Sequence, residues 1–88
     1  MCTTISQSGP VTGAGKGPGG WFVVNQATVA FDHGTHNAAE HALILDFANY
    51  DLGTDARVAV ELDLASGRRL LEQLRATIEA AERSGLPG

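Results

Sequence analysis

The 88-residue sequence is poor in several residue types, and each shortage excludes a class of protein. A single cysteine, Cys2, excludes an internal disulfide framework. One lysine and a net charge of -4 argue against a nucleic-acid surface, which needs clustered cations to neutralise phosphates. No apolar run approaches the roughly 18 residues of a membrane span, and no basic-then-apolar leader opens the chain. We therefore expect a cytoplasmic protein that binds neither nucleic acid nor a membrane.

Hydrophobic residues make up 43% of the chain, enough for one small folded domain over residues 1–88. Short β-prone segments predict strands over residues 2–7, 21–31, 41–48 and 57–63. The glycine- and proline-rich residues 8–20 are expected to form a loop, because neither a helix nor a long strand tolerates that composition.

The final segment, residues 64–84, is predicted to be a helix. Its apolar residues recur at spacings of one, three and four and so form a single stripe: Leu70, Leu71, Leu74, Ile78 and Ala81. Asp63 or Ser66 can cap its start, and Gly85 ends it. The predicted fold is therefore α+β, a four-stranded antiparallel sheet in the order β-β-β-β-α with one C-terminal helix on one face.

Two consequences follow if the sheet is a meander. Cys2, His33, His41 and Asp63 then lie at the same edge, because strand starts and ends alternate between the two edges. One helix is about 10 Å wide, whereas four strands spaced about 4.8 Å apart span roughly 15 to 20 Å. The helix cannot cover that face alone, so we expect a homodimer.

The segment Asp32–His41 is the most informative part of the sequence, because it holds all three histidines. Their spacings of three and five residues differ from the spacing of four that places two ligands on one helix face. Three protein ligands with an open position are typical of catalytic zinc, and two histidines with a carboxylate are typical of non-haem iron. We predict a divalent transition metal, zinc or iron, bound by His33, His36, His41 and Asp32.

Cys2 and Glu40 are the candidate catalytic residues, or further metal ligands, in an enzyme that would act on a small molecule. One alternative is a non-catalytic dimeric module that binds a small molecule or a partner protein. Another is a metal-free enzyme in which Cys2 is the nucleophile and a nearby histidine the base. The sequence alone does not choose between these hypotheses.

Other residues are predicted to be structural. Asp46 interrupts an apolar strand and needs a partner, which Arg57 can supply. Trp21 and Phe22 are expected to anchor the core. Glycines around Lys16 resemble phosphate-binding loops, but a strand rather than a helix follows them, so we reject nucleotide binding.

The chain resembles a small family of bacterial proteins, mostly actinobacterial, of unassigned function. The resemblance rests on the opening Met1-Cys2-Thr3, on Gly15-Lys16-Gly17 leading to Gly20-Trp21-Phe22, on Phe31-Asp32-His33 with His36 and Glu40-His41, and on Ala56–Leu62. It covers most of the chain and supports the division into elements, but it implies no activity.

Overall fold

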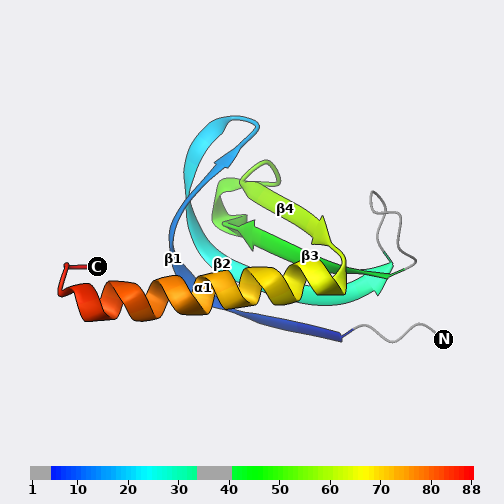
Figure 1. Cartoon of the computed structure of the whole chain (residues 1–88). Helices are drawn as coiled ribbons and strands as arrows, with labels where there is room; N and C mark the ends of the chain where they lie inside the picture. Colours follow the sequence, from blue (N-terminus) through cyan, green and yellow to red (C-terminus); the bar gives the residue numbers. More distant parts are fainter. Residues whose placement is uncertain (1–4, 34–40) are drawn as a thin grey trace.

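The computed structural model describes residues 5–33 and 41–88, in which four strands precede one long helix (Figure 1). The elements are β1 (Ile5–Gly17), β2 (Gly20–His33), β3 (His41–Ala48), the short 3-10 helix η1 (Tyr50–Leu52), β4 (Arg57–Leu62) and α1 (Leu64–Ser84). Each strand pairs antiparallel with the next, so the sheet order is β1-β2-β3-β4. The predicted α+β fold, its meander and the bounds of the helix are confirmed.

The loop predicted over residues 8–20 is wrong. Residues 8–17 form most of β1, and Pro18 and Gly19 alone make the turn into β2. β1 is an edge strand with only β2 as a ladder neighbour, so it tolerates a proline, and the pairing shifts register between Pro10 and Gly13. Pairing to β2 outweighs the poor strand propensity of glycine.

Two of these glycines are required by a close approach of strands. We call residues 13–24, beyond the register shift, the arm; it curls over β4 (Figure 1). A Cβ at Gly15 would lie 3.0 Å from Val24 Cγ2 and 3.4 Å from Val58 Cγ2. A Cβ at Gly17 would lie 3.2 Å from the carbonyl oxygen of Asp55. The absence of side chains therefore lets β1 reach the far strand of its own sheet.

The core of the described residues is small. The buried apolar residues are Val24, Ala42, Ala48 and Ala56, and no large side chain in these ranges is fully buried. The buried Asn49 links the connection after β3 to β2, because its side-chain amide donates to the Val23 carbonyl at 3.0 Å. Its Oδ1 accepts from the Asp51 amide at 3.2 Å and so caps η1. The strands thus hold one another largely through backbone pairing and small residues.

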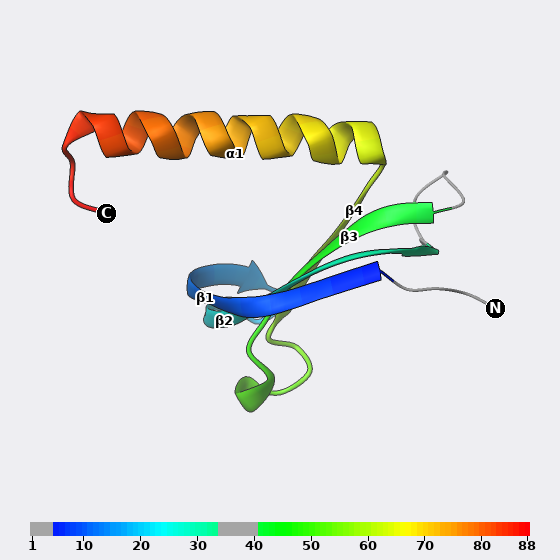
Figure 2. The same ribbon diagram turned by 90° about the horizontal axis from the view of Figure 1, so that it is seen from below.

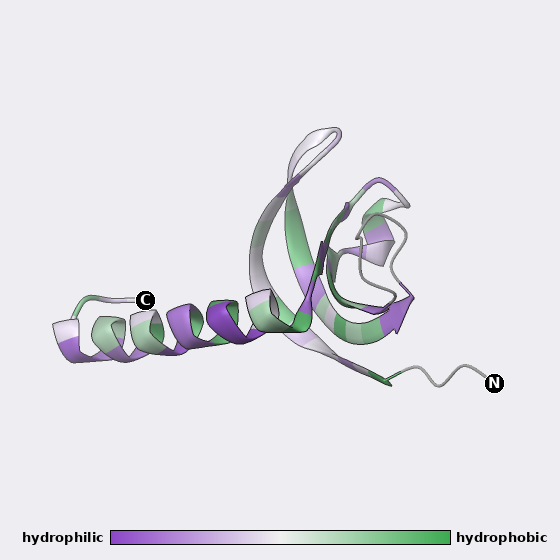
Figure 3. Ribbon diagram, turned by 45° about the vertical axis from the view of Figure 1, so that its right-hand side comes forward, coloured by the Kyte–Doolittle hydropathy of each residue, from purple (hydrophilic) through white to green (hydrophobic). Residues whose placement is uncertain are grey.

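α1 lies on one side of the sheet and stands away from it over most of its length (Figure 2). None of its residues is buried, and its close point of approach is Gly67, where an added Cβ would collide with Leu43 Cδ2. Apolar and polar residues alternate along its ribbon, as expected of an amphipathic helix (Figure 3). Within residues 5–33 and 41–88, no helix has both the length and the apolar composition needed to span a membrane.

Candidate functional site

His33 and His41 are brought together at one end of the sheet, where β2 ends and β3 begins. They are the last paired residues of the β2–β3 ladder and lie directly opposite each other. Their ring centroids are 4.4 Å apart with an interplanar angle of 31°, and the Phe31 ring stacks on His41 at 5.5 Å. The two imidazoles therefore lie side by side on one face of the sheet. The sequence predicted His33 and His41 at the same edge, and their direct pairing is the structure's addition. We call them the histidine pair.

The backbone around the pair is ordered by neighbouring residues. The Oδ1 of Asp32 accepts a hydrogen bond from the His33 amide at 2.8 Å. Successive residues of a strand point to opposite faces, so the Asp32 carboxylate belongs to the face away from the imidazoles. Asp32 thus holds the backbone amide of His33 at the end of β2. Its role as a metal ligand stays a prediction.

Three other predicted site residues, Cys2, His36 and Glu40, lie outside the described ranges. Their places in the chain are still informative: residues 34–40 join His33 to His41, and residues 1–4 precede Ile5, which pairs with Phe31 next to the pair. Among residues 5–33 and 41–88, no group of three or more His, Cys, Asp or Glu side chains is placed to hold a metal ion. The described part of the site is the histidine pair.

Asp63 lies near the same edge but is already engaged. It follows β4, whose last residue Leu62 pairs with Leu43, two residues from His41. Its side chain caps α1 by accepting a hydrogen bond from the Ser66 amide at 2.7 Å. That hydrogen bond lowers the pKa of Asp63 below its usual value, because it stabilises the carboxylate. The carboxylate therefore accepts a hydrogen bond from a backbone amide that has no partner within the first turn of α1.

The predicted partnership of Asp46 and Arg57 is confirmed on the opposite face. Arg57 Nε donates to both carboxylate oxygens of Asp46, at 2.9 and 2.8 Å, and the Asp46 side chain is only 13% exposed. The hydrogen bond and the charge of Asp46 raise the pKa of Arg57. This pair joins β3 to β4 and is structural.

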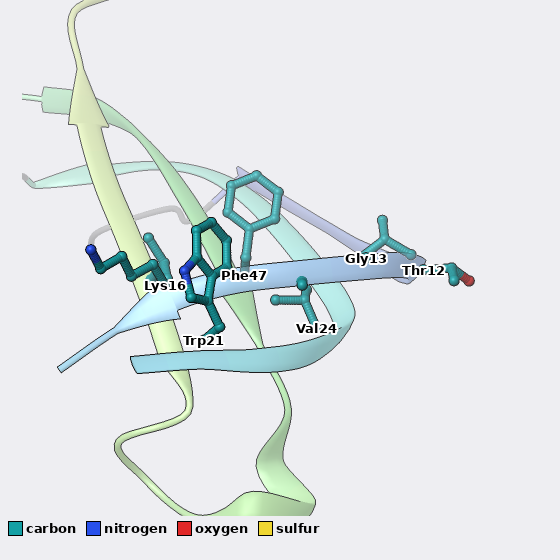
Figure 4. A pocket seen from close by; sticks show the side chains of 10 residues that line it. Thr12, Gly13, Lys16, Trp21, Val24 and Phe47 are labelled. Atoms are coloured by element: carbon teal, nitrogen blue, oxygen red, sulfur yellow. The ribbon is translucent and has the colours of Figure 1, made fainter. Parts of the chain in front are cut away.

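A second candidate site lies at the other end of the sheet, and the sequence analysis missed it. It is an open cleft of about 460 Å³ between the arm and strands β3 and β4, lined by Lys16, Trp21, Val24, Phe47 and Val58 among others (Figure 4). Lys16 and Trp21 are register partners across the arm, and Val24 is buried. We call it the arm cleft.

The expectation that Trp21 anchors the core is wrong, because 71% of its surface is exposed, whereas Phe22 is half-buried beside Gly15 and Gly17. The signal for this exposure was the position of Trp21 next to the hairpin turn. A residue that close to the tip has few neighbours to cover it.

Comparisons with known proteins place the chain without naming an activity. No curated protein and no solved structure matches it. A family model, described as a family of unknown function, matches residues 1–87. That match spans both the histidine pair and the arm cleft and confirms that the chain resembles a family of unassigned function. The chain belongs to this family of unknown function, DUF6295.

Proposed function

We propose that the protein binds a divalent transition metal through the imidazoles of His33 and His41. The observation that carries this proposal is the placement of two imidazoles opposite each other, 4.4 Å apart, at the edge of a paired ladder. Neutral imidazole is a common ligand of zinc and iron. The regular β2–β3 pairing fixes both backbones, so little ordering is needed before an ion binds.

The separation of the two rings suits a shared ion. Two nitrogen ligands of a tetrahedral zinc, each about 2.0–2.1 Å from the metal, lie roughly 3.3 Å apart. Rings with centroids 4.4 Å apart are close enough to share one ion when a nitrogen of each ring turns toward it. The segment between the two histidines supplies His36 and Glu40 as candidate further ligands, and an open position would allow the metal to activate water on a small molecule.

The test uses untagged protein purified without chelators or nickel resin. Metal content is measured by plasma mass spectrometry and zinc affinity by competition with a chromophoric chelator. We expect near one equivalent of metal per chain, and at least a hundredfold weaker zinc binding after His33→Ala or His41→Ala. Gln73→Ala on the exposed surface of α1 is the control and should bind as the unchanged protein does. Zinc binding that survives both histidine substitutions would contradict the proposal.

His36→Ala and Glu40→Ala then decide the remaining ligands. A loss of zinc affinity comparable to that of the histidine pair identifies a ligand, whereas an unchanged zinc affinity excludes the residue as a ligand. Cys2 is tested separately by its rate of alkylation at pH 7, because a cysteine nucleophile is reactive without any metal.

A second candidate function, binding of a small apolar anion without catalysis, is favoured by the arm cleft. The cleft is lined mostly by apolar side chains, Lys16 belongs to its lining, and its volume is in the range of small-molecule sites. Trp21, the only tryptophan, lines it and reports binding by fluorescence. We expect anilinonaphthalene sulfonate to quench Trp21 saturably, and Lys16→Gln to weaken binding severalfold. Unchanged binding by the Lys16→Gln protein would exclude a site that recognises the anion.

A further inference from the structure

α1 is a long amphipathic helix with almost nothing packed against it. It has 21 residues, none of them buried. Its apolar stripe is exposed along the whole length, at 40% for Leu70, 50% for Leu71, 56% for Leu74 and 49% for Ile78. Helices in proteins gain most of their stability from burial of such a stripe. The stripe is therefore built for a contact that one chain does not make.

The sheet has an uncovered apolar face on the side where α1 lies. Val29 on β2 is 43% exposed and Val60 on β4 is 41% exposed, and both are register partners of Leu45 on β3. A groove of about 600 Å³ runs between this face and the first half of α1, lined by Val29, Leu43 and Leu45 on the sheet and by residues including Leu70, Leu71 and Leu74 on the helix. Ile78 lies beyond the groove.

The two uncovered surfaces are complementary and belong to one chain. α1 begins beside β3 and then runs past the sheet, so its C-terminal half projects beyond the strands in both perpendicular views (Figures 1 and 2). A projecting apolar half-helix and a vacant apolar groove thus lie on the same side of the molecule. A two-fold axis fills both at once, because each chain inserts its projecting half into the groove of the other.

The exposed area also fits a second copy. The whole chain exposes 6713 Å², whereas a compact monomer of 9.2 kDa exposes about 4900 Å². The excess has the sign expected of a chain that buries further surface against a partner, as the protomers of obligate homodimers do. The exposed stripe and the exposed sheet face both lie within the described residues and carry the proposal.

We propose that the protein forms a two-fold symmetric homodimer in which the C-terminal half of α1 from each chain packs on the β2–β4 face and groove of the other. The charges that flank the stripe are of both signs, as in Arg75 with its partners Glu72 and Glu79, so two identical helices approach without a net like-charge surface. The dimer expected from the sequence thus acquires a specific interface.

The first experiment is sedimentation equilibrium of the full-length protein between about 1 and about 100 µM. We expect a dimer for the unchanged protein and at least a hundredfold larger dissociation constant for Ile78→Glu, which places a charge on the stripe. Ala76→Glu adds the same charge on the opposite side of the same helix and should leave the dimer intact. An unchanged protein that is folded and monomeric at 100 µM, or a dimer that tolerates Ile78→Glu, would overturn the proposal.

A mixing experiment tests the reciprocal contact and remains decisive even where Ile78→Glu alone does not fold. Val29→Lys changes the groove, and its homodimer should also be weakened. In a mixture of the two variants, a heterodimer has one unmodified helix-on-sheet contact and one in which a new carboxylate faces a new ammonium. We expect dimers to reappear on mixing, as folded heterodimers in native mass spectrometry. Two folded variants that stay monomeric when mixed would show that the stripe meets some other partner.

Discussion

The sheet and the helix of this small protein meet the demand for burial in different ways. The strands contact one another throughout, and all of the buried residues in the described ranges belong to β2, β3 or the connection that follows β3. α1 is longer than any single strand and buries none of its residues. The comparison teaches that the sheet is organised by contacts within one chain, whereas the helix leaves its apolar stripe exposed, and we propose this stripe as the surface for contacts between chains.

The difference has a structural cause in the lengths of the elements. β4 has only six residues and leads directly into α1, so the helix starts where β4 ends. It then runs across the sheet and extends beyond the strands (Figure 2). At 1.5 Å per residue, 21 residues extend for about 31 Å. Only the first turns can therefore lie over the strands of the same chain, and the remainder is free for a partner.

The largest expected effect within the sheet comes from Gly17→Ala. The added Cβ would lie 3.2 and 3.5 Å from two backbone carbonyl oxygens and 3.1 Å from Phe22 Cε1, and backbone cannot yield as a flexible side chain does. We expect a loss of about 2 kcal/mol in the free energy of unfolding, measured with urea. The loss should be the same at all protein concentrations, because the contact lies within one chain.

Gly9→Ala is the matched control on the same strand. No atom lies within 4 Å of the position that an added Cβ would take there, and the φ of Gly9 is not positive, so we expect equal or slightly higher stability. A Gly17→Ala protein as stable as Gly9→Ala would mean that the arm does not need to approach β4 closely. The contrast between a self-contained sheet and a helix that needs a partner would then lose its basis.

Hydrogen exchange compares the two regions directly. If α1 is protected through the dimer, its amides should exchange about tenfold faster at 1 µM than at 100 µM, because the fraction of dissociated chains varies roughly with the inverse square root of concentration. The amides that pair β2 with β3 should change less than about threefold over the same range. Exchange of α1 that ignores concentration would show that the helix is ordered by its own chain.

A smaller effect is expected from Asp46→Asn, which removes the charge that Arg57 contacts through Nε. Arg57 is 54% exposed, so solvent weakens the pair, and we expect a loss of about 1 kcal/mol in the free energy of unfolding. Asp51→Asn, a loss of one exposed carboxylate on η1, is the control and should change stability by less than about 0.5 kcal/mol. Equal effects of the two substitutions would make the pair a surface contact of no structural value.

Periodicity predicted the elements whose stability comes from a regular pattern. The helix over residues 64–84 and the strand over residues 41–48 were predicted with the observed bounds, and the common edge of the two histidines and the Asp46–Arg57 pair followed from the meander. β1 was predicted poorly, because its glycines disfavour a strand locally and become favourable only where the arm approaches β4. Local propensity does not report contacts between segments that are distant in the sequence, such as the approach of the arm to β4.

The candidate sites show the same division. The histidine pair was predicted because its two residues are joined by one short connection, so their separation depends on a single hairpin. The arm cleft was not, because it gathers residues from all four strands, and its shape depends on how far the arm curls. Trp21 was expected in the core, and the fold shows instead that it is exposed next to the hairpin turn, where few residues cover it.

The smallest expected effect concerns the junction between the two regions, where Asp63 caps α1. Hydrogen bonding to Ser66 lowers the pKa of Asp63 in the folded protein, so the folded state binds this proton less readily than the unfolded state does. The contribution of the cap is therefore present above the unfolded pKa of about 3.9 and is lost as the pH falls through the lowered, folded value. We expect helical circular dichroism of the unchanged protein to decline in this acid range.

Asp63→Asn isolates that contribution, because asparagine still accepts the hydrogen bond from the Ser66 amide but carries no titrating group. The thermal midpoints of the two proteins should differ most near neutral pH and converge once the pH falls below the lowered pKa of Asp63, where this side chain too is protonated. A difference that does not vary with pH would mean that the charge of Asp63 contributes nothing beyond its hydrogen bond. The helix start would then depend on geometry alone, and its stability would come from the surface that α1 presents to a second chain.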